Sequence, residues 1–384
     1  MGVKMIKRSY GALLLIVVFC MLLLLHQMYT DDFMSPLSRS ATHKSREYVR
    51  WLKKSEQEIR NLITHQYNST YKNPCWYNNG SLTCLPYFYL AGMPKCGTTD
   101  LWSKITQHPH ITACGWNPAM RATTLCRKEP HFWGKHRFKY GETIHSYLKH
   151  WKKFAQQLED KALPASKQIV GDGSASTFWQ LTYRNNVSYR NDPLEYTTAQ
   201  LIRFIQPQAK FIVIFRNPSE RLYSQYNYQK DRSIKSADNF HDCIVHSIDK
   251  AHVHMKNFTL RESAYLRRND ESPLWIPRIF LGFYDVFVTD WLRSFPRNQF
   301  LFLRLEDWKK DCVNILPEVF EFLSVGPISK EDIAIVCRNE AENVNKLTKE
   351  TMLPRTKLLL DEFYRASLQR LAFELDDNRF LWND

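Results

Sequence analysis

The chain has 384 residues, of which 44% are hydrophobic and 14% aromatic. This composition excludes a wholly disordered protein, because it supplies enough apolar side chains for a large buried core. Lys and Arg outnumber Asp and Glu by 53 to 39. The net charge of +14 suits an acidic partner such as phosphate, sulfate, nucleic acid or an anionic membrane surface.

The first predicted element is a membrane span near the N-terminus. An uninterrupted apolar run from Tyr10 to Leu25 follows the basic segment 1–9, and about twenty helical residues cross a bilayer core. No small-residue cleavage site follows the run, so we predict an uncleaved signal anchor at 10–29. The basic residues ahead of it predict a cytoplasmic tail at 1–9 and a lumenal remainder, hence a single-pass type II protein. The short span favours the Golgi membrane.

The Asn-x-Ser/Thr glycosylation sequons and the cysteines also favour a lumenal location, where disulfides form. Of the nine cysteines, Cys20 lies in the span and Cys96 in a loop described below, which leaves seven. Because seven is odd, one thiol is expected to be free or bonded to another chain. We predict a disulfide between Cys75 and Cys84, since the Asn-Gly segment between them is a natural reversal. N-glycosylation is predicted at Asn68, Asn79, Asn186 and Asn257.

Residues 30–84 are predicted to form a lumenal stem. Within it, the segment 48–63 places apolar residues at helical spacing among charged ones. Two arrangements are open: a short coiled coil that forms a homodimer through the stem, or an amphipathic helix lying on the globular domain. The stripe covers barely two heptads, which favours the second.

Residues 85–384 are predicted to form one catalytic domain. Short apolar runs alternate there with longer helical patterns, which indicates an α/β fold with a central parallel sheet flanked by helices. The predicted strands are 87–91, 168–170, 210–215 and 299–305. The predicted helices are 99–107, 147–157, 197–205, 219–229, 284–293 and 357–373.

The first motif is the segment 90–102, in which a strand runs into a helix. Such a loop directs backbone N–H groups and a helix N-terminus at one point, which favours anion binding. Lys95 adds a positive charge, Gly97 permits close approach, and Thr98 and Thr99 supply hydroxyl donors. The lysine precedes the glycine, unlike the nucleotide-triphosphatase loop, so a P-loop kinase is disfavoured. The alternative is an ordinary strand–turn–helix connection.

The second motif, 211–224, is another strand that runs into a helix, which Pro218 helps to start. Arg216 stands at the strand end and Ser224 two turns into the helix. A guanidinium fork and a hydroxyl so placed suit one phosphate group. Taken alone, the pair would more often be structural, but its combination with the first motif favours a phosphate site.

Together the two motifs resemble those of sulfotransferases that use 3′-phosphoadenosine 5′-phosphosulfate, in particular the Golgi carbohydrate sulfotransferases. The resemblance covers most of 87–384 and implies a P-loop-like sulfotransferase fold with this nucleotide as co-substrate. It also implies that Arg216 and Ser224 bind the donor's 3′-phosphate. The residues implied to bind its 5′-phosphosulfate are Lys95, Cys96, Gly97, Thr98 and Thr99.

A third motif, 127–133, is similar to the Lys-Glu-x-His-Phe pattern of the glycosaminoglycan branch, in which the glutamate is taken as the general base. Independently, a sugar hydroxyl that attacks sulfur must lose its proton, and Glu129 is a suitable acceptor. His131 would orient that carboxylate or contact the acceptor. The alternative is a surface ion pair of Glu129 with Arg127 or Lys128.

Gly173 departs from the heparan sulfate enzymes, which have a lysine at this position of a similar segment. The segments 352–355 and 379–382 look more like the branch that 6-O-sulfates N-acetylgalactosamine 4-sulfate in chondroitin and dermatan. Lys349 and Arg355 are further candidates to reach the donor, with a solvated helix cap as the alternative.

Basic and aromatic residues near the third motif are candidates for binding a sulfated polyanion. The alternatives are a solvated charged face for the basic residues and core packing for the tryptophans. The basic residues are Arg121, Arg127, Lys128, Lys135, Arg137 and Lys139, and the tryptophans are Trp116, Trp133 and Trp179.

These observations predict transfer of a sulfuryl group to a glycosaminoglycan hydroxyl, with the 6-OH of N-acetylgalactosamine 4-sulfate as the preferred acceptor. Catalytic roles are predicted for Lys95, Glu129 and His131. No metal is predicted, because no Cys-x-x-Cys or His-x-x-x-His spacing supports a site. The alternatives are a heparan sulfate or other glycan acceptor and an inactive, membrane-anchored glycan-binding protein. Nucleic acid is not expected as a partner of a lumenal domain.

Overall fold

The computed structural model describes residues 53–64, 66–114, 126–137, 141–179, 197–228, 236–265, 279–339 and 350–383. The predicted tail and membrane span lie outside these ranges, and in the described part no helix is both long and apolar enough to cross a bilayer. Residues Ser55–Asp384 form one compact unit. Also outside the described residues are Trp116, Arg121, Lys139, Asn186 and Lys349, together with the side chain of Lys135.

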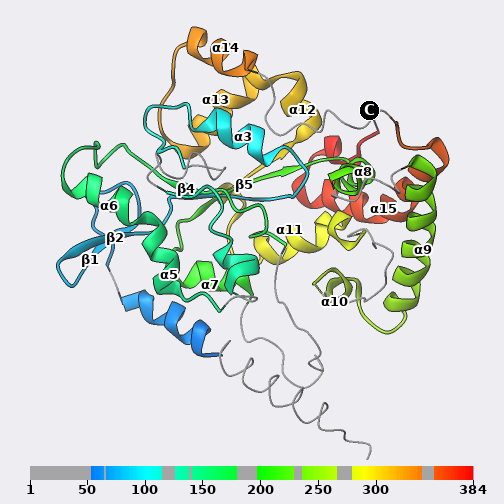
Figure 1. The fold of residues 1–384 in the computed structure, drawn as a ribbon, viewed down its shortest axis with the longest axis horizontal. Coiled ribbons are helices and arrows are strands. Elements are labelled where there is room, and N and C mark those ends of the chain that lie inside the picture. Colours follow the sequence, from blue (N-terminus) through cyan, green and yellow to red (C-terminus); the bar gives the residue numbers. More distant parts are fainter. Residues whose placement is uncertain are drawn as a thin grey trace, which may run out of the picture. The chain divides into compact units, whose positions relative to one another are not determined.

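A parallel four-stranded sheet lies at the centre of this unit, in the order β4-β3-β5-β6 (Figure 1). The apolar runs of β3 and β5 are buried almost throughout, as expected for parallel strands covered on both faces. The predicted parallel sheet is confirmed, as are three of its four strands. The strands are β3 (Phe88–Gly92), β4 (Gly171–Asp172), β5 (Lys210–Phe215) and β6 (Phe300–Arg304).

The predicted strand 168–170 is wrong in position. Ile169 forms only an isolated bridge with Ile111, and the paired strand begins at Gly171, which lies opposite Phe88. A Cβ atom at position 171 would lie 2.4 Å from the Phe88 ring. The two strands therefore pack closely only where a glycine stands, a contact that hydrophobic patterning does not reveal.

Helices cover both faces of the sheet. α3, α13 and α14 lie on one side and α5, α7 and α11 on the other, while α8 continues from the end of β5 (Figure 1). Each predicted helix is present, although the one at 147–157 is divided among α5, a 3-10 turn and α6. The bounds are α3 (Thr98–Ile105), α5 (Ile144–Leu148), α6 (Lys152–Glu159), α7 (Thr198–Ile205), α8 (Pro218–Tyr228), α9 (Ala237–Met255), α10 (Leu260–Tyr265), α11 (Tyr284–Leu292), α12 (Leu305–Lys310), α13 (Cys312–Leu323), α14 (Lys330–Arg338) and α15 (Pro354–Leu375).

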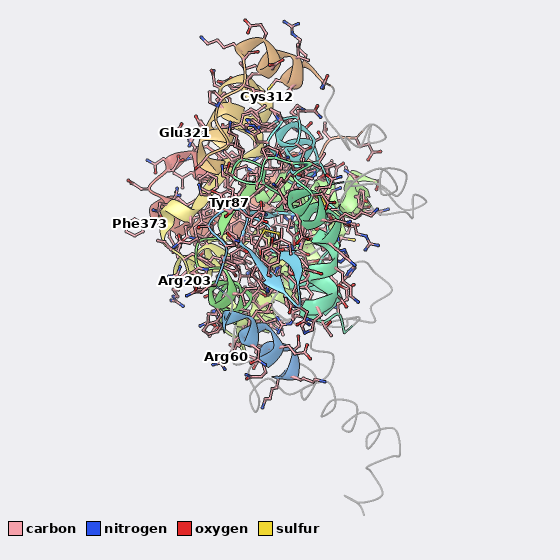
Figure 2. All side chains as sticks on the ribbon, turned by 90° about the vertical axis from the view of Figure 1, so that its left-hand side faces the viewer. Arg60, Tyr87, Arg203, Cys312, Glu321 and Phe373 are labelled. Atoms are coloured by element: carbon pink, nitrogen blue, oxygen red, sulfur yellow. A yellow bond between two sulfur atoms is a disulfide. The ribbon has the colours of Figure 1, made fainter. Side chains whose placement is uncertain are left out.

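Aromatic side chains fill the space between the layers. Phe211 of β5 packs its ring against those of Tyr89, Trp291 and Phe300, and large rings of this kind bury much apolar area per residue. The side chains crowd around the sheet in Figure 2, whereas the labelled Phe373 of α15 projects outward and is 89% exposed. The nearly unbroken burial of β3 and β5 shows that the core lies on both faces of the sheet.

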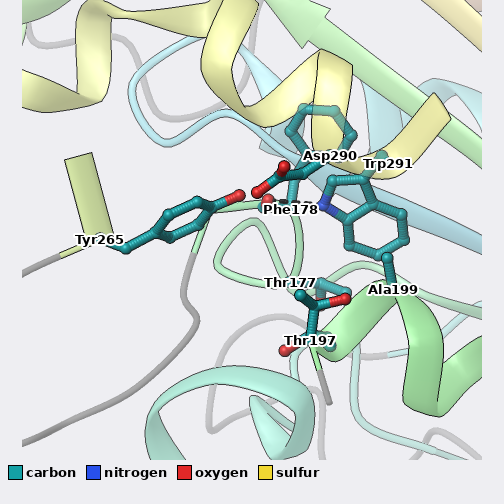
Figure 3. Close-up of a pocket in the computed structure, with 8 residues that line it drawn as sticks. Thr177, Phe178, Thr197, Ala199, Tyr265, Asp290 and Trp291 are labelled. Carbon is teal, nitrogen blue, oxygen red and sulfur yellow. Dashed lines mark hydrogen bonds between the residues drawn. The ribbon is translucent and has the colours of Figure 1, made fainter. Parts of the chain in front are cut away.

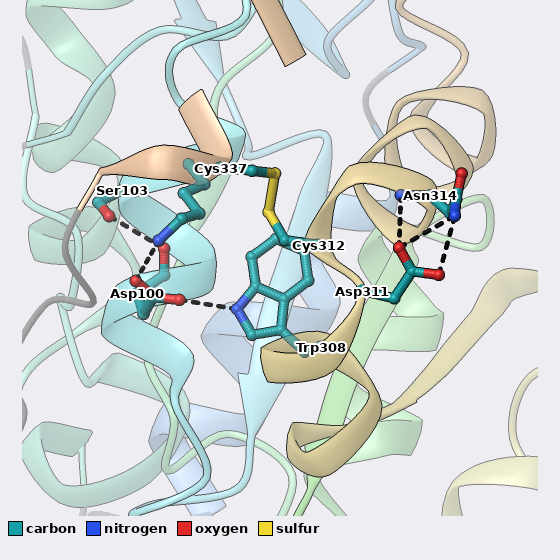
Figure 4. The surroundings of a disulfide bond; sticks show 8 residues. Asp100, Ser103, Trp308, Asp311, Cys312, Asn314 and Cys337 are labelled. Atoms are coloured by element: carbon teal, nitrogen blue, oxygen red, sulfur yellow. Dashed lines mark hydrogen bonds and ion pairs between the residues drawn. A yellow bond between two sulfur atoms is a disulfide. The ribbon is translucent and has the colours of Figure 1, made fainter. Parts of the chain in front are cut away.

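The predicted disulfide between Cys75 and Cys84 is confirmed. It closes a hairpin of β1 (Cys75–Asn78) and β2 (Ser81–Cys84). The turn residues Asn79 and Gly80 both have positive φ, 49° and 80°, as a two-residue hairpin turn requires. Cys243 is the odd thiol of the seven. The other disulfides are Cys114–Cys126 and Cys312–Cys337, and Figure 4 shows the second beside the hydrogen bond from Trp308 to Asp100.

The described part of the predicted stem helix packs on the domain. Residues 53–60 are helical, and Ile59 is fully buried. Arg137 donates from Nε to Ser55 Oγ at 3.1 Å, and its guanidinium lies 3.6 Å from Glu56. Of the two predicted arrangements, the amphipathic helix lying on the globular domain is therefore the one seen for these residues. Residues 55–84 belong to the compact unit.

Candidate active site

The first two motifs and the segment around Gly173 meet at one edge of the sheet. β3 pairs with β4 on one side and with β5 on the other, all in parallel. Because the carboxyl ends of parallel strands share an edge, the loops that follow them emerge together. These loops are 93–97 after β3, 173–176 after β4 and 216–217 after β5.

The loop after β3 requires glycine for two reasons. Gly97 has φ of 82°, and a Cβ atom there would lie 2.5 Å from Leu305 Cδ1. Lys95 also has a positive φ, 68°, so the backbone turns sharply before Thr98 and Thr99 open α3. The loop is tied to the sheet because Met93 N donates to Ile214 O at 2.9 Å. Its shape is that of an anion-binding turn ahead of a helix.

Lys95 is a cation close to a second cation. Its ammonium lies over the ring of Tyr228, 3.5 Å from the ring centroid. Burial, together with the positive charge of Arg216, lowers the pKa of Lys95 to about 8. An anion bound between the two groups would favour the charged form again, so this end of the site suits a phosphate or a phosphosulfate.

Arg216 and Ser224 lie next to the same end of the site as Lys95. Arg216 contacts Glu220 at 3.3 Å, and the next backbone N–H, of Asn217, donates to Glu306 at 3.0 Å. Ser224 stands four residues before Tyr228 on α8, so the two share a helix face. Since the Tyr228 ring contacts Lys95, the fold brings together the predicted donor residues of both motifs.

Cys96 has a narrower role than its neighbours. Its side chain is fully buried, with Sγ 3.7 Å from the carbonyl oxygen of Pro94. Burial raises the pKa of the thiol to about 12, so the group stays neutral at physiological pH. Only the backbone of Cys96 is placed to serve as part of an anion-binding loop.

Glu129 forms the centre of a second cluster. Its carboxylate lies 2.8 Å from Lys128 Nζ and 3.1 Å from His131 Nε2, and its side chain is 32% exposed. Burial raises the pKa of Glu129, but the hydrogen bond from His131 and the charge of Lys128 outweigh that effect and lower the pKa to about 2. Glu129 is therefore ionised at neutral pH and reachable from solvent.

His131 is held by the loop after β4. Its Nδ1 lies 3.2 Å from Ser176 Oγ, and its backbone N–H donates to Ser174 Oγ at 2.9 Å. Ser174 N donates to Asp172 at 2.9 Å, and the Tyr147 hydroxyl donates to the same carboxylate at 2.8 Å. The roles of the two serines were missed in the sequence, where the only signal was a Gly-Asp-Gly-Ser-Ala-Ser run after an apolar segment.

Several residues predicted to bind a polyanion lie inside the domain. Lys128 and Arg137 are buried, so their assignment to a basic surface is wrong. Trp133 is also buried and belongs to the core rather than to a sugar-stacking surface. The ion pair between Glu129 and Lys128 exists, but the lysine is not at the surface. Arg355, a candidate for reaching the donor, pairs with Asp238 at 2.7 Å.

Figure 3 shows a pocket that is lined by other residues than those of the two clusters. The indole N–H of Trp291 donates to Phe178 O at 2.8 Å beside it. None of the residues with a predicted donor or catalytic role is among those that line it: Thr177, Phe178, Thr197, Thr198, Ala199, Tyr265, Asp290 and Trp291.

Comparison with known proteins places this arrangement in a family. Carbohydrate sulfotransferase 15 of mouse is 31% identical over 399 residues, covering 86% of this chain and 68% of the relative. The human protein of that name is 30% identical with the same coverage. The bifunctional heparan sulfate N-deacetylase/N-sulfotransferase 4 of mouse is 22% identical, over 69% of this chain and 26% of that protein.

Among solved structures, a sulfotransferase from Alicyclobacillus acidocaldarius is similar, with a TM-score of 0.48 and 20% identity, covering 78% of this chain and all of that one. Residues 85–362 match the family model described as sulfotransferase domain. This match covers the sheet, the loop after β3 and the Glu129 cluster, and it confirms the resemblance seen in the motifs. The chain belongs to the sulfotransferase family.

Proposed function

We propose that this sulfotransferase transfers a sulfuryl group from 3′-phosphoadenosine 5′-phosphosulfate to the 6-hydroxyl of N-acetylgalactosamine 4-sulfate in chondroitin or dermatan sulfate. The observation that carries the proposal is the link between a cationic anion-binding loop and an ionised, partly exposed carboxylate, Glu129, because Lys128 contacts both Glu129 and Thr99. The similarity to carbohydrate sulfotransferase 15 supports a glycan acceptor.

The step proposed is an in-line displacement at sulfur. The acceptor oxygen forms a bond to sulfur while the bond between sulfur and the bridging phosphate oxygen breaks, which leaves 3′-phosphoadenosine 5′-phosphate. The hydroxyl proton goes to Glu129, which His131 orients through its 3.1 Å contact. Lys95 stabilises the charge that develops on the departing phosphate. Catalysis then depends mainly on positioning and electrostatics, as in phosphoryl transfer.

The 3′-phosphate of the donor is assigned to Arg216 and Ser224. The guanidinium offers a planar set of donors that suits phosphate oxygens, and the hydroxyl adds one more. Arg216 contacts Glu220 at 3.3 Å in this structure, so donor binding replaces part of that ion pair with a phosphate contact. The loop backbone from Lys95 to Thr99 receives the 5′-phosphosulfate.

We also propose that the enzyme is a single-pass type II protein of the Golgi membrane with a lumenal catalytic domain. The disulfides support an oxidising compartment. Asn79 lies in an exposed hairpin turn and Asn257 is exposed after α9, so both are accessible for glycosylation. Asn68 is partly buried, with its side-chain oxygen accepting from Thr70 N.

The acceptor is tested with the purified full chain, radiolabelled donor and a panel of chondroitin, dermatan and heparan sulfate chains. The products are digested and the labelled disaccharide is identified. Label at the 6-position of 4-sulfated N-acetylgalactosamine supports the proposal. Label on heparan units would support sulfuryl transfer but contradict the proposed acceptor. Donor-independent glycan binding without any transfer would favour an inactive binding protein.

A further inference from the structure

Lys128 has no role in the reaction as set out above, yet it contacts both halves of the site. Its side chain is 1% exposed. We propose that Lys128 is a positioning residue that holds Glu129 in register with the donor loop, and that Gly173 is required because its missing side chain leaves room for the Lys128 stem. The inference rests on the proposed function, since it concerns how the base of that reaction is placed.

The ammonium of Lys128 connects residues from distant parts of the chain. Nζ donates to Glu129 Oε1 at 2.8 Å and to Thr99 Oγ1 at 3.3 Å. Thr99 belongs to the first turn of α3, directly after the loop that follows β3. One buried cation therefore bridges the carboxylate proposed as base and the helix start proposed to bind the phosphosulfate.

A buried ammonium strongly restricts both of its partners. Removing one partner of a buried ion pair leaves an uncompensated charge, which costs several kcal/mol. Movement of Glu129 away from Thr99 would separate Lys128 from one of these two partners and would carry such a cost. The bridge thus resists changes in the distance between the base and the donor loop, and a displacement of about 1 Å at such a site costs roughly 100-fold in rate.

Gly173 limits where the Lys128 stem can lie. A Cβ atom at position 173 would be 2.8 Å from Lys128 Cγ, 3.1 Å from Lys128 Cε and 2.9 Å from Trp102 Cε3. The backbones cannot separate easily, because Gly173 N donates to Lys128 O at 2.7 Å. Any side chain at this position would push the stem, and with it the ammonium, out of place.

This contact also explains the absence of a side chain at position 173 in physical terms. Gly173 is not among the glycines with positive φ, so its backbone conformation does not demand glycine. The space is needed instead, and Lys128 fills it. In this chain, the cation beside the end of β4 is Lys128, which comes from the segment that carries Glu129.

The test measures sulfate transfer by the full chain and by Lys128→Met, which keeps most of the stem and removes the charge. We expect kcat to fall by about 100-fold. We also expect the acidic limb of the kcat/KM profile to move to higher pH by about one to three units, because a nearby cation lowers a carboxylate pKa by that much. Donor KM should change less than kcat.

Lys104→Met is the matched control. Lys104 is a second buried lysine with a carboxylate partner, Asp100, and neither residue has a proposed catalytic role. It should lower the melting temperature in the same way as Lys128→Met while leaving the pH profile unchanged. If Lys128→Met keeps wild-type kcat and pH profile, or if Lys104→Met shifts the profile equally, the inference is wrong.

Gly173→Ala gives a second, independent test. If the alanine acts by displacing Lys128, the double variant with Lys128→Met should lose about as much activity as the worse single variant. Losses that multiply would overturn the link between the two residues. A wild-type chain with no transfer to any acceptor would contradict the proposed function itself. That outcome is distinct from the one in which the wild type is active and Lys128→Met has the same activity, which would contradict only the role of Lys128.

Discussion

Two lysines at the same edge of the sheet are held in opposite ways. Lys95 lies over the ring of Tyr228 with Arg216 close by, and its pKa is lowered to about 8. Lys128 is buried and forms an ion pair with Glu129 at 2.8 Å. The first lysine is placed where a bound anion would stabilise its charge, and the second already has its anion within the protein.

We propose that this difference separates the site into a donor end and an acceptor end. At the proposed donor end, Lys95 and Arg216 lie close together, and a bound nucleotide would supply the missing negative charge. At the acceptor end, Glu129 is held by Lys128 and His131, so the carboxylate is fixed before any substrate arrives. Preorganised charge of this kind costs no rearrangement during the reaction. The following predictions test this separation.

The largest effect is expected from removing the charge of the base. Glu129→Gln keeps the size of the side chain but cannot accept the acceptor's proton, so kcat should fall by about 100- to 10,000-fold. Sulfate transfer under saturating donor and acceptor measures it. Donor affinity should stay near that of wild type, and a large loss of donor binding would contradict the separation into two ends.

The pH dependence of donor binding tests the charge on Lys95. A lysine is charged below its pKa, and the pKa of Lys95 is about 8, so donor affinity should weaken as the pH rises through that value. The limit is about tenfold per pH unit for the loss of one proton. Titration calorimetry from pH 6.5 to 9.5 measures the change. Lys95→Arg should flatten the dependence, since arginine stays charged; an equally steep dependence in that variant would assign the titration to another group.

A smaller effect is expected at the 3′-phosphate. Ser224→Ala removes one hydroxyl donor and should raise the donor KM about tenfold, the value of one hydrogen bond to a charged group. A kinetic comparison of KM with kcat separates this from a catalytic loss. If kcat falls while KM stays constant, Ser224 does not act through donor binding.

The smallest effect on activity is expected at the hairpin. Replacing both Cys75 and Cys84 by serine opens a short loop and should lower the free energy of unfolding by about 2 to 3 kcal/mol. Chemical denaturation measures this loss. At a temperature at which the variant is folded, kcat/KM should match that of wild type, and a change in donor KM would connect the hairpin to the donor end.

The donor end could be predicted from the sequence because its signals are local. A strand, a turn with Lys95 and Gly97, and a helix follow one another directly, and the Arg216 motif repeats that order. Parallel strands then bring the two loops to one edge without further information. The sheet and the helices next to it follow from the same periodic patterns.

The acceptor end could be predicted only in part, because it depends on contacts between distant segments. Glu129 and His131 were recognisable from their motif, but the serines that hold His131 come from the loop after β4. Lys128 has the sequence signature of a surface residue, and its burial follows from the space above Gly173. Charged residues are rarely buried without a partner. The sequence offered the pairing of Lys128 with Glu129 as an alternative, but only the fold shows that Lys128 is buried.

The most direct test of the two-ended site is a binding measurement with the product nucleotide, 3′-phosphoadenosine 5′-phosphate. Titration calorimetry on wild type, Lys95→Ala and Glu129→Gln compares the ends without requiring turnover. We predict that Lys95→Ala weakens binding at least tenfold, the loss of one charged contact, whereas Glu129→Gln binds like wild type. Equal binding by wild type and Lys95→Ala, or a comparable loss in both variants, would contradict the assignment of the two ends.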